Sequence, residues 1–336
     1  MSIDLIDTHS HLYLPAFTED MDEVISRMKQ SGVKRVLLPN IDLESYPQML
    51  ALCDRWPDVF VPMLGLHPCD VKANGEDVLH RLHEKRGERK FCAVGEIGMD
   101  LYWDKSFQEE QVRAFETQIA WAKEWDLPIV IHARDAFDEI FTVLDRVHDE
   151  RLHGVFHCFT GSLEQAQRIQ GYGTFMFGIG GVLTYPKSGL AAVVREIPLE
   201  LLVLETDAPF LPPIPHRGKR NESSYVRIVA EALAQVKDCS LQKIADQTTL
   251  NDRVQVSYTV YTQHGEGAPL TVIMLDELFN GISLGLIDTT RVVNIQMDNV
   301  FPLLGLLYSL RVPNSRFHTF LDLVVREFLQ SQGVAI

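Results

Sequence analysis

Short runs of aliphatic and β-branched residues alternate with longer amphipathic stretches over the first two-thirds of the chain. In the longer stretches apolar residues return every three or four positions, which is typical of helices that bury one face. The expected strands are Ile3–Asp7, Arg35–Leu38, Val59–Leu66, Cys92–Glu96, Ile129–His132, Val155–Phe159, Phe175–Ile179 and Leu201–Glu205. The expected helices include Met21–Gln30, Leu43–Arg55, Phe107–Trp125, Ala136–Val147, Leu163–Gln170 and Tyr225–Val236.

Eight strand–helix units in about 250 residues predict an α/β fold, the closed parallel (β/α)8 or TIM barrel. An open doubly wound sheet is the alternative. Such a sheet normally has fewer strands and a glycine-rich turn after its first strand. Here His9-Ser10-His11 follows the first expected strand, and the pattern therefore favours the barrel.

The pattern changes after about Asn251. Residues 254–336 carry seven acidic and four basic side chains, with no lysine and no cysteine. A ninth strand would find no partner in a closed barrel, so we expect a barrel over residues 1–253 and an appended α/β segment of unknown role over 254–336. Its expected elements are strands at Val254–Tyr261 and Val292–Met297 and helices at Leu270–Phe279 and Ser315–Leu329.

Composition narrows the class of protein. The 46 acidic and 31 basic side chains give a formal charge of −15, which argues against a surface that binds nucleic acid everywhere but allows a local basic cleft. The five cysteines form no CxxC pair, so a disulfide framework or a zinc ribbon is not expected. The N-terminal residues lack the pattern of a signal peptide, and no apolar run approaches the ~20 residues of a membrane span. We therefore expect a cytoplasmic protein without membrane segments.

Histidines and carboxylates stand at the ends of the expected strands. Active sites of parallel barrels lie at the carboxyl ends of their strands, where the βα loops gather. His9 and His11 are two positions apart, so both side chains point to one face and could bind one cation. Four imidazoles and two carboxylates suit zinc, manganese or magnesium. The predicted metal ligands are His9, His11, Glu96, His132, His157 and Asp207.

Two groups of ligands so close together suggest two divalent metal ions, with Glu96 as the bridging carboxylate. Two cations ~3.5–4 Å apart lower the pKa of a bound water and neutralise charge that develops on a phosphoryl oxygen. We therefore predict hydrolysis, with Glu96 and Asp207 as the catalytic carboxylates. Asp207 would be a metal ligand, the base that accepts a proton from the attacking water, or both in turn.

Cationic residues follow the last expected strand. The loop after the prolines at 212–215 carries Arg217, Lys219 and Arg220, which would attract an anionic substrate. Arg217 can bind a phosphate through two hydrogen bonds and Lys219 as a point charge. Arg134, two residues after His132, is a second candidate for phosphate binding.

Five further residues have two interpretations each. His67 either contacts substrate or shapes its turn, and Asp7 either orients a ligand or has a structural role. Tyr102 and Trp103 could stack on a base, although packing against the barrel rim is the favoured interpretation. Cys158 could form a Cys-His nucleophile with His157, but a buried thiol that faces away from the site is the favoured interpretation, because neighbouring strand residues point to opposite faces.

Several of these segments together resemble the TatD family of metal-dependent deoxyribonucleases, within the amidohydrolase-like barrels. The resemblance covers residues 1 to about 251. It implies a metal-dependent hydrolase that acts on phosphodiesters, usually by 3′→5′ trimming of DNA or RNA ends, and it implies that the six predicted ligands hold the metals. The matching segments are Asp7–Leu12, Gly65–Pro68, Val94–Asp100, Pro128–Arg134, His157–Gly161, Leu204–Pro209 and Arg217–Glu222.

The chain departs from this family at its end. Family members usually close with a short helix soon after the stretch that is Thr248–Asn251 here, and this chain continues with Asp252–Gln255 instead. The closing helix is therefore expected to be lost or replaced. The tail faintly resembles the C-terminal part of a LysR-type effector-binding domain, through Asn280–Leu284 and Phe317–Phe328. Self-association through the tail is an equally open expectation.

Three functions follow from these observations. The favoured one is a two-metal phosphodiesterase acting on single-stranded DNA or RNA ends. The second is an amidohydrolase that cleaves a small C–N or ester substrate; many such enzymes bridge their metals with a lysine carbamate on the fourth strand, where this chain has Glu96. The third is a non-catalytic sensor or partner protein in which the tail dominates.

Overall fold

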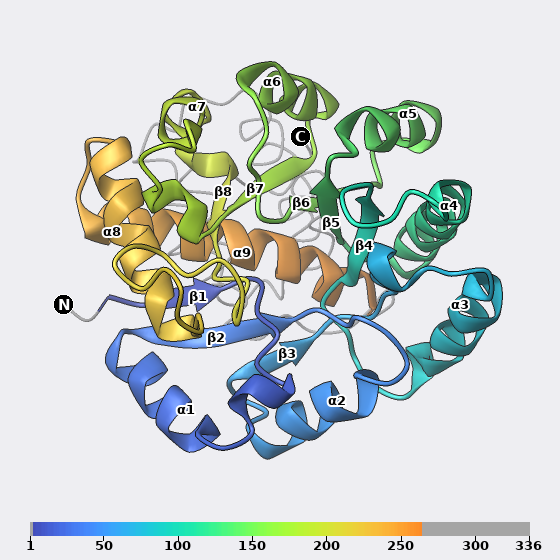
Figure 1. Ribbon diagram of the computed structural model, residues 1–336, viewed down its shortest axis with the longest axis horizontal. Helices are drawn as coiled ribbons and strands as arrows, with labels where there is room; N and C mark the ends of the chain where they lie inside the picture. The colour runs from blue at the N-terminus through green and yellow to red at the C-terminus, as the bar shows by residue number, and fades with distance from the viewer. Residues whose placement is uncertain (1–2, 264–336) are drawn as a thin grey trace, which may run out of the picture. The chain divides into compact units, whose positions relative to one another are not determined.

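The structure, a computed structural model, describes residues 3–263 as eight parallel strands surrounded by helices (Figure 1). The strands pair in the orders β1-β2-β3 and β4-β5-β6-β7-β8. All eight expected strands are present, although several are shorter than expected. Their bounds are β1 Leu5–Asp7, β2 Val33–Leu38, β3 Phe60–Pro62, β4 Val94–Asp100, β5 Ile129–Arg134, β6 Gly154–Phe156, β7 Phe175–Ile179 and β8 Leu202–Leu204.

Backbone hydrogen bonds close the two sets of strands into one barrel. Thr8 N donates to Leu204 O at 2.9 Å, which joins the end of β8 to the end of β1. Cys92 N donates to Pro62 O at 3.0 Å and Gly95 N donates to Leu64 O at 3.1 Å, which joins β3 to β4. These bonds leave no open sheet edge between neighbouring strands, and the (β/α)8 prediction is confirmed.

Helices cover the outside of the barrel, and their apolar faces pack on the strands (Figure 1). The six named helices are confirmed to within a few residues, whereas α3, α7 and α9 were not among the expected helices. Among the described residues, no helix combines the length and apolar character that crossing a membrane requires. The bounds are α1 Met21–Gln30, α2 Tyr46–Arg55, α3 Gly75–Glu84, α4 Gln108–Trp125, α5 Phe137–Val147, α6 Leu163–Tyr172, α7 Leu190–Glu196, α8 Val226–Val236 and α9 Leu241–Gln263.

Strand β4 continues four residues past Glu96, beyond its expected end. Gly98 makes this possible, because its φ of +129° and its lack of a side chain let β4 and β5 approach closely. A Cβ atom at Gly98 would lie 2.2 Å from the carbonyl oxygen of His132. The extension places Asp100 at the end of β4, beside the predicted ligands.

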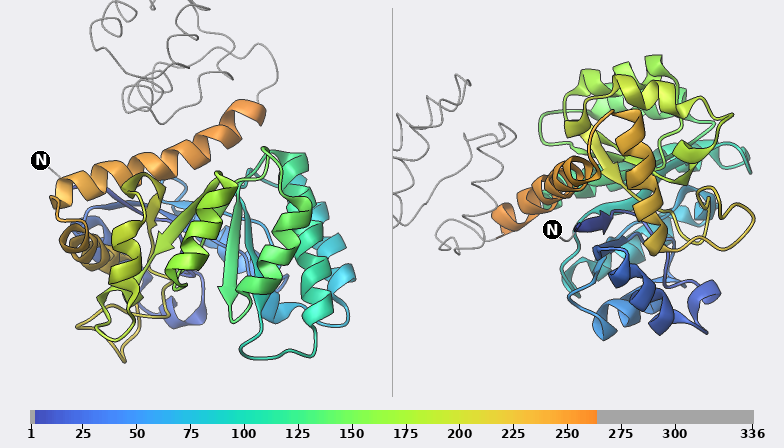
Figure 2. Two further views of the ribbon diagram at one scale, coloured as in Figure 1. Left: turned by 90° about the horizontal axis from the view of Figure 1, so that it is seen from above. Right: turned by 90° about the vertical axis from the view of Figure 1, so that its left-hand side faces the viewer.

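The strand expected at Val254–Tyr261 is wrong, because α9 extends through this segment to Gln263. Residues 241–263 contain no proline or glycine that would end the helix. The helix can therefore continue through the segment whose alternating apolar residues predicted a strand. α9 lies across the end of the barrel where the strands begin (Figure 2). The closing helix is therefore present and longer than expected, rather than lost. The elements expected from residue 264 onward, and with them the resemblance to a LysR-type domain, lie outside the described residues.

Hydrogen bonds attach the first half of α9 to this end of the barrel. The side-chain amide of Asn251 donates to Leu202 O at 2.7 Å and to Leu199 O at 2.9 Å. Thr249 Oγ1 donates to Asp4 O at 3.3 Å. Asn251 is almost fully buried, and these bonds give the carbonyl groups of Leu199 and Leu202 a side-chain donor where β8 begins.

Candidate metal centre

The six predicted ligands lie together at the carboxyl ends of the strands. His9 and His11 follow β1, Glu96 lies within β4, His132 lies within β5, His157 follows β6 and Asp207 follows β8. Glu96 and His132 lie on strands, and the other four lie directly after strands, so all six meet where the strands end. Four of them, His9, His11, Glu96 and His157, are fully buried.

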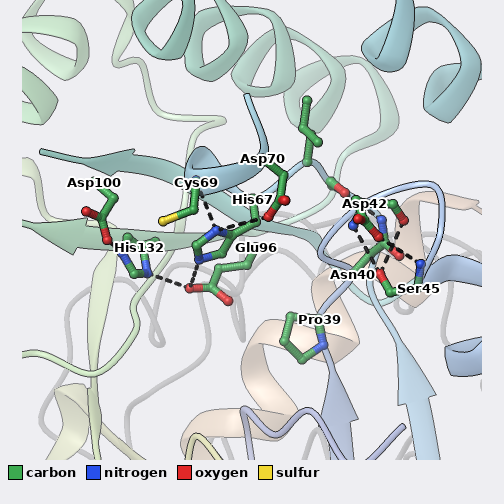
Figure 3. A network of polar contacts seen from close by, with 12 residues as sticks. Pro39, Asn40, Asp42, Ser45, His67, Cys69, Asp70, Glu96, Asp100 and His132 are labelled. Atoms are coloured by element: carbon green, nitrogen blue, oxygen red, sulfur yellow. Dashed lines mark hydrogen bonds and ion pairs between the residues drawn. The ribbon is translucent and has the colours of Figure 1, made fainter. Parts of the chain in front are cut away.

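Glu96 lies at the centre of the cluster, and each of its carboxylate oxygens faces a different pair of histidines. Oε2 lies 3.1 Å from His9 Nε2 and 3.4 Å from His11 Nε2. Oε1 lies 2.7 Å from His132 Nδ1 and 3.4 Å from His157 Nε2. Figure 3 shows the carboxylate on its Oε1 side, next to His132 and His67. One carboxylate thus joins two sets of nitrogen donors.

Asp207 completes the first set. Its Oδ1 lies 3.6 Å from His11 Nε2 and 3.9 Å from His9 Nε2. The His9 ring stacks on the His157 ring with 3.5 Å between their centroids, which holds the two sets against each other. The side chain of Asp207 is 13% exposed, in contrast to the buried Glu96. Asp207 is therefore the carboxylate of the pair that solvent and substrate can reach.

Backbone hydrogen bonds from the end of β2 fix the position of Glu96. Glu96 N donates to Asn40 O at 3.2 Å, and Asn40 N donates to Gly95 O at 3.1 Å. The Asn40 side chain is buried and donates to Gly65 O at 2.7 Å. Asn40 thus holds the strand that carries the central carboxylate.

Close contacts between imidazoles and carboxylates shift the pKa values of both kinds of group in the cluster. Burial alone would raise the pKa of Glu96, but His67, His9 and His157 outweigh it and hold this pKa well below its usual range. Burial opposes protonation of His11 and His157, yet the neighbouring carboxylates raise both pKa values to about 9. In the absence of metal, protons occupy ring nitrogens that would otherwise face a cation.

Hydrogen bonds on the far side of the His11 and His132 rings, and a carboxylate beside the His157 ring, determine which nitrogen faces the cluster. Tyr13 donates its only hydroxyl proton to Pro39 O at 2.6 Å, so the contact of 3.0 Å between Tyr13 Oη and His11 Nδ1 requires His11 to donate from Nδ1. The Nε2 lone pair of neutral His11 then points at Glu96 and Asp207. Such a contact fixes the tautomer and the orientation of a metal-binding imidazole.

Carboxylates orient the other two rings. Glu205 Oε1 lies 3.1 Å from His157 Nδ1, which leaves Nε2 of His157 facing Glu96. Asp100 Oδ2 lies 2.9 Å from His132 Nε2, which leaves Nδ1 of His132 facing Glu96. A carboxylate behind an imidazole is the arrangement that raises its basicity toward a cation.

His67 has the opposite arrangement. Its Nδ1 accepts a hydrogen bond of 3.1 Å from Cys69 N, so neutral His67 carries its proton on Nε2 (Figure 3). This Nε2 lies 3.4 Å from Glu96 Oε1. His67 therefore presents a hydrogen-bond donor to the site and also caps its own turn, so both interpretations of this residue stay open.

The residues present fit divalent cations. His9, His11 and Glu96 offer ligand atoms within 4.8 Å of one another. Glu96 and His132 form a second such group with His67, which would supply a ligand atom only in its other tautomer. The cluster combines several neutral-nitrogen donors with carboxylates in a buried site, a set suited to zinc, manganese or magnesium. Its carboxylate oxygens and ring nitrogens converge at distances of 2.7–3.9 Å, and a cation would take the place of the protons that the rings carry without metal.

Comparison with known proteins agrees with this geometry. The family model described as TatD related DNase matches residues 6–254. The chain belongs to this family. Its fold and its buried histidine and carboxylate clusters are those of a metal-dependent hydrolase.

Similar proteins match the barrel over nearly their own full length. The chain is 40% identical to the uncharacterized metal-dependent hydrolase YabD of Bacillus subtilis over 74% of this chain and 96% of that one. It is 32% identical to the 3′-5′ ssDNA/RNA exonuclease TatD of Dickeya dadantii over 68% of this chain and 89% of that one. The crystal structure of the TatD homologue YjjV from Escherichia coli superposes with a TM-score of 0.71 at 33% identity, covering 76% of this chain and 98% of that chain.

One residue near the centre of this TatD family member differs from expectation. Cys158 lies on the same side as His157, because its φ of +45° breaks the alternation expected of a strand, and its sulfur belongs to a group with His157 and Asp207. Burial and nearby carboxylates raise the pKa of its thiol well above the usual range, so it remains a poor nucleophile. The contacts of Asp7 fit the structural one of its two interpretations: it accepts hydrogen bonds from Thr206 N at 2.8 Å and Ser223 Oγ at 2.5 Å and joins β1 to the loop after β8. Its contact with the predicted ligand His9 is a hydrogen bond of 3.5 Å from the backbone N.

The predicted substrate-binding cations occupy different environments. The Arg134 guanidinium lies 4.0 Å from the Tyr102 ring centroid, and that of Arg217 lies 4.4 Å from the ring centroid of Tyr185. Arg220 instead donates to both carboxylate oxygens of Asp20, at 2.7 and 2.6 Å. A substrate phosphate would have to compete with that carboxylate, so Arg134 and Arg217 are better placed for binding.

Sequence patterns missed the residues that orient the ligands. Tyr13, Asn40, Asp100 and Glu205 were not assigned to the site. The sequence could have assigned two of them to the site. Asp100 lies two positions after Gly98, within a segment that matches the family. Glu205 lies two positions before Asp207, so the strand alternation places both on the same face. No pattern connects Tyr13 to Pro39 or Asn40 to Gly95, since these contacts join different strands.

Proposed function

We propose that this protein is a two-metal phosphodiesterase that removes nucleotides from the 3′ ends of single-stranded DNA or RNA. The observation that supports the proposal is the position of Glu96, whose two oxygens face different donor sets. In this arrangement His9, His11, Glu96 and Asp207 would hold one divalent cation, and Glu96, His132 and His157 the other. When bound, such a pair supplies an activated water and neutralises charge that develops on phosphoryl oxygens.

The protein side chains have distinct tasks in this reaction. Asp207 would accept the proton of the attacking water, because its carboxylate is the more accessible one and lies at the rim of the cluster. His67 would donate a hydrogen bond from Nε2 to a substrate oxygen, since Cys69 N fixes its tautomer. Glu96 would contact both cations and so hold the two groups of ligands at a fixed separation.

Phosphate recognition is assigned to the cations on the loops around the mouth. Arg134 is exposed at the end of β5, two residues after His132 and on the same side of the strand. Arg217 and Lys219 stand on the loop after β8, and Arg220 would contribute only if it left Asp20. A few cations at the mouth of a protein with net charge −15 favour binding of a strand end over coating of a long duplex.

Nucleotide release from a labelled oligonucleotide tests this proposal. The expected result is stepwise 3′→5′ shortening of a 5′-labelled single strand, dependent on magnesium or manganese and lost in His132→Ala. His80→Ala, which alters an exposed histidine of α3, is the matched control and should keep full activity. Hydrolysis of amide or lactone substrates by fully metallated protein, with the oligonucleotide left intact, would favour an amidohydrolase instead.

A further inference from the structure

Large apolar side chains exposed in the described part of the chain gather on two loops at the mouth of the barrel. Trp103 is 69% exposed and Tyr102 is 53% exposed, both on the loop between β4 and α4. The loop after β8 carries the others, Phe210, Leu211 and Ile214. Phe210 is half exposed and its ring lies 6.0 Å from the His11 ring. An exposed apolar group concentrated at one functional opening is a typical mark of ligand contact.

The expected packing of Trp103 against the barrel rim is therefore wrong. Two-thirds of its surface faces water, which leaves too little contact area to stabilise the fold appreciably. The Tyr102 ring meets the Trp103 ring edge to face at 4.9 Å, so the two rings support each other and leave a π face free.

One carboxylate couples these rings to the metal centre. Asp100 Oδ2 orients His132, while Oδ1 of the same side chain accepts hydrogen bonds from Tyr102 N at 3.0 Å and Trp103 N at 3.2 Å. The distance between the aromatic pair and the predicted ligand His132 is thus fixed by a buried group rather than by a free loop. A substrate held by the rings would be positioned relative to the reacting phosphate.

Arg134 adds a cation to the aromatic pair. Its guanidinium lies 4.0 Å from the Tyr102 ring centroid and 5.1 Å from the Trp103 ring centroid. Tyr102 and Arg134 also line a surface groove of about 520 Å³, together with Thr160 and Ser162. Asp138 and Glu139 line the groove too, so its acidic part disfavours phosphates and an occupant would be held there mainly by its bases.

We infer that Tyr102, Trp103 and Arg134 form a stacking subsite for a nucleobase of single-stranded nucleic acid. The inference rests on the proposed function and adds a site that recognises the base rather than the phosphate. Flat rings bind any base through its π face, and this requires bases that are not already stacked in a duplex. The Arg134 guanidinium, stacked on the same rings, would contact the phosphate of the bound nucleotide.

The test compares binding of two oligonucleotides by the metal-loaded protein. Both are fluorescein-labelled decamers with phosphorothioate linkages that slow cleavage; one carries thymine throughout and the other lacks bases at its three 3′-terminal nucleotides. Fluorescence anisotropy should show the wild-type protein binding the base-bearing strand about 10-fold more tightly or better. Trp103→Ala should bring the ratio of the two dissociation constants close to one, whereas Trp103→Phe, which keeps an aromatic face, should keep most of it.

An unchanged ratio in Trp103→Ala would overturn the inference while nucleotide release by the wild-type protein still supported the proposed function. Because the ratio is measured without turnover, lack of nucleotide release would instead contradict the proposed function alone. Sedimentation velocity checks the competing occupant, a second copy of this chain. A shift toward monomer in Trp103→Ala, with an unchanged binding ratio, would assign the exposed rings to self-association and contradict stacking.

Discussion

Buried polar groups are stabilised differently at the two ends of the barrel. Where the strands begin, Asn251 is buried with its amide bonded to two backbone carbonyls, so its polar atoms are satisfied within the protein. Where the strands end, Glu96 and its histidines are buried against one another, and protons or cations must balance their charges. The difference indicates that one end stabilises the fold while the other is organised for chemistry.

Removing the central carboxylate should have the largest effect. Glu96→Gln keeps the size of the side chain but removes the negative charge shared by the two donor sets. Since metal assistance contributes several kcal/mol to such reactions, nucleotide release should fall by ~10³-fold. Steady-state rates at saturating manganese measure the loss. Activity within tenfold of the wild type would contradict the bridging role of Glu96.

A smaller loss is expected when an orienting contact is removed. Tyr13→Phe deprives His11 Nδ1 of its acceptor, so the imidazole should adopt the metal-binding tautomer less often. Manganese affinity, measured by competition with a fluorescent chelator, should fall about 10-fold or more. Tyr185→Phe is the matched control, because the Tyr185 hydroxyl also donates to a backbone carbonyl, Pro212 O at 2.8 Å, but contacts no predicted ligand. Equal losses in both variants would show a general effect of removing a hydroxyl.

At the other end of the barrel, Asn251→Ala should change stability but not chemistry. The substitution leaves the carbonyls of Leu199 and Leu202 without their side-chain donor, which lowers the free energy of unfolding by about 2 kcal/mol. Urea denaturation measures this value, and kcat of the folded variant should match the wild type. Lys243→Ala, on an exposed position of the same helix, should alter neither quantity. A large fall in kcat for Asn251→Ala would show that the two ends are coupled.

The stability of the metal-free protein should depend on pH through the histidines at the end of the barrel where the strands end. This effect is expected to be smaller than the preceding ones. The pKa values of His11 and His157 are raised to about 9 from an ordinary value of 6.5, so the native state binds more protons than the unfolded state between these limits. Their contribution to stability is present below pH 6.5 and is lost as the pH rises through about 9. The melting temperature in chelator should therefore fall over this range.

Manganese should release protons at pH 7 by displacing them from these rings, and calorimetry in buffers of different ionisation enthalpy detects the release. A melting temperature that stays constant from pH 6.5 to 9, together with no proton release, would contradict the assigned pairing. Asn251→Ala should lower the melting temperature at every pH and leave the slope unchanged, because it alters no titrating group at the mouth.

The sequence allowed prediction of those features that depend on local periodicity. The eight strands follow from short aliphatic runs, and their common carboxyl end predicted that His9, His11, Glu96 and Asp207 would converge. Periodicity failed where local geometry departs from the ideal. Cys158 faces the ligands because of its positive φ, and residues 254–261 alternate like a strand yet continue a helix that began at Leu241.

Contacts between distant strands could not be predicted at all. The orientation of His11 depends on Tyr13 and on the carbonyl of Pro39, which lies 26 positions from Tyr13 in the sequence. The placement of Glu96 depends on Asn40, at the end of β2. These contacts arise only when the barrel closes, so no pattern within one segment contains them.

Anomalous diffraction from a crystal soaked with manganese tests the central claim most directly. The account predicts two anomalous peaks per chain, ~3.5–4 Å apart, with one oxygen of Glu96 bound to each. Asp207 should contact one of them and His132 the other. A single peak, or two peaks that do not share Glu96, would contradict the bridged two-metal site.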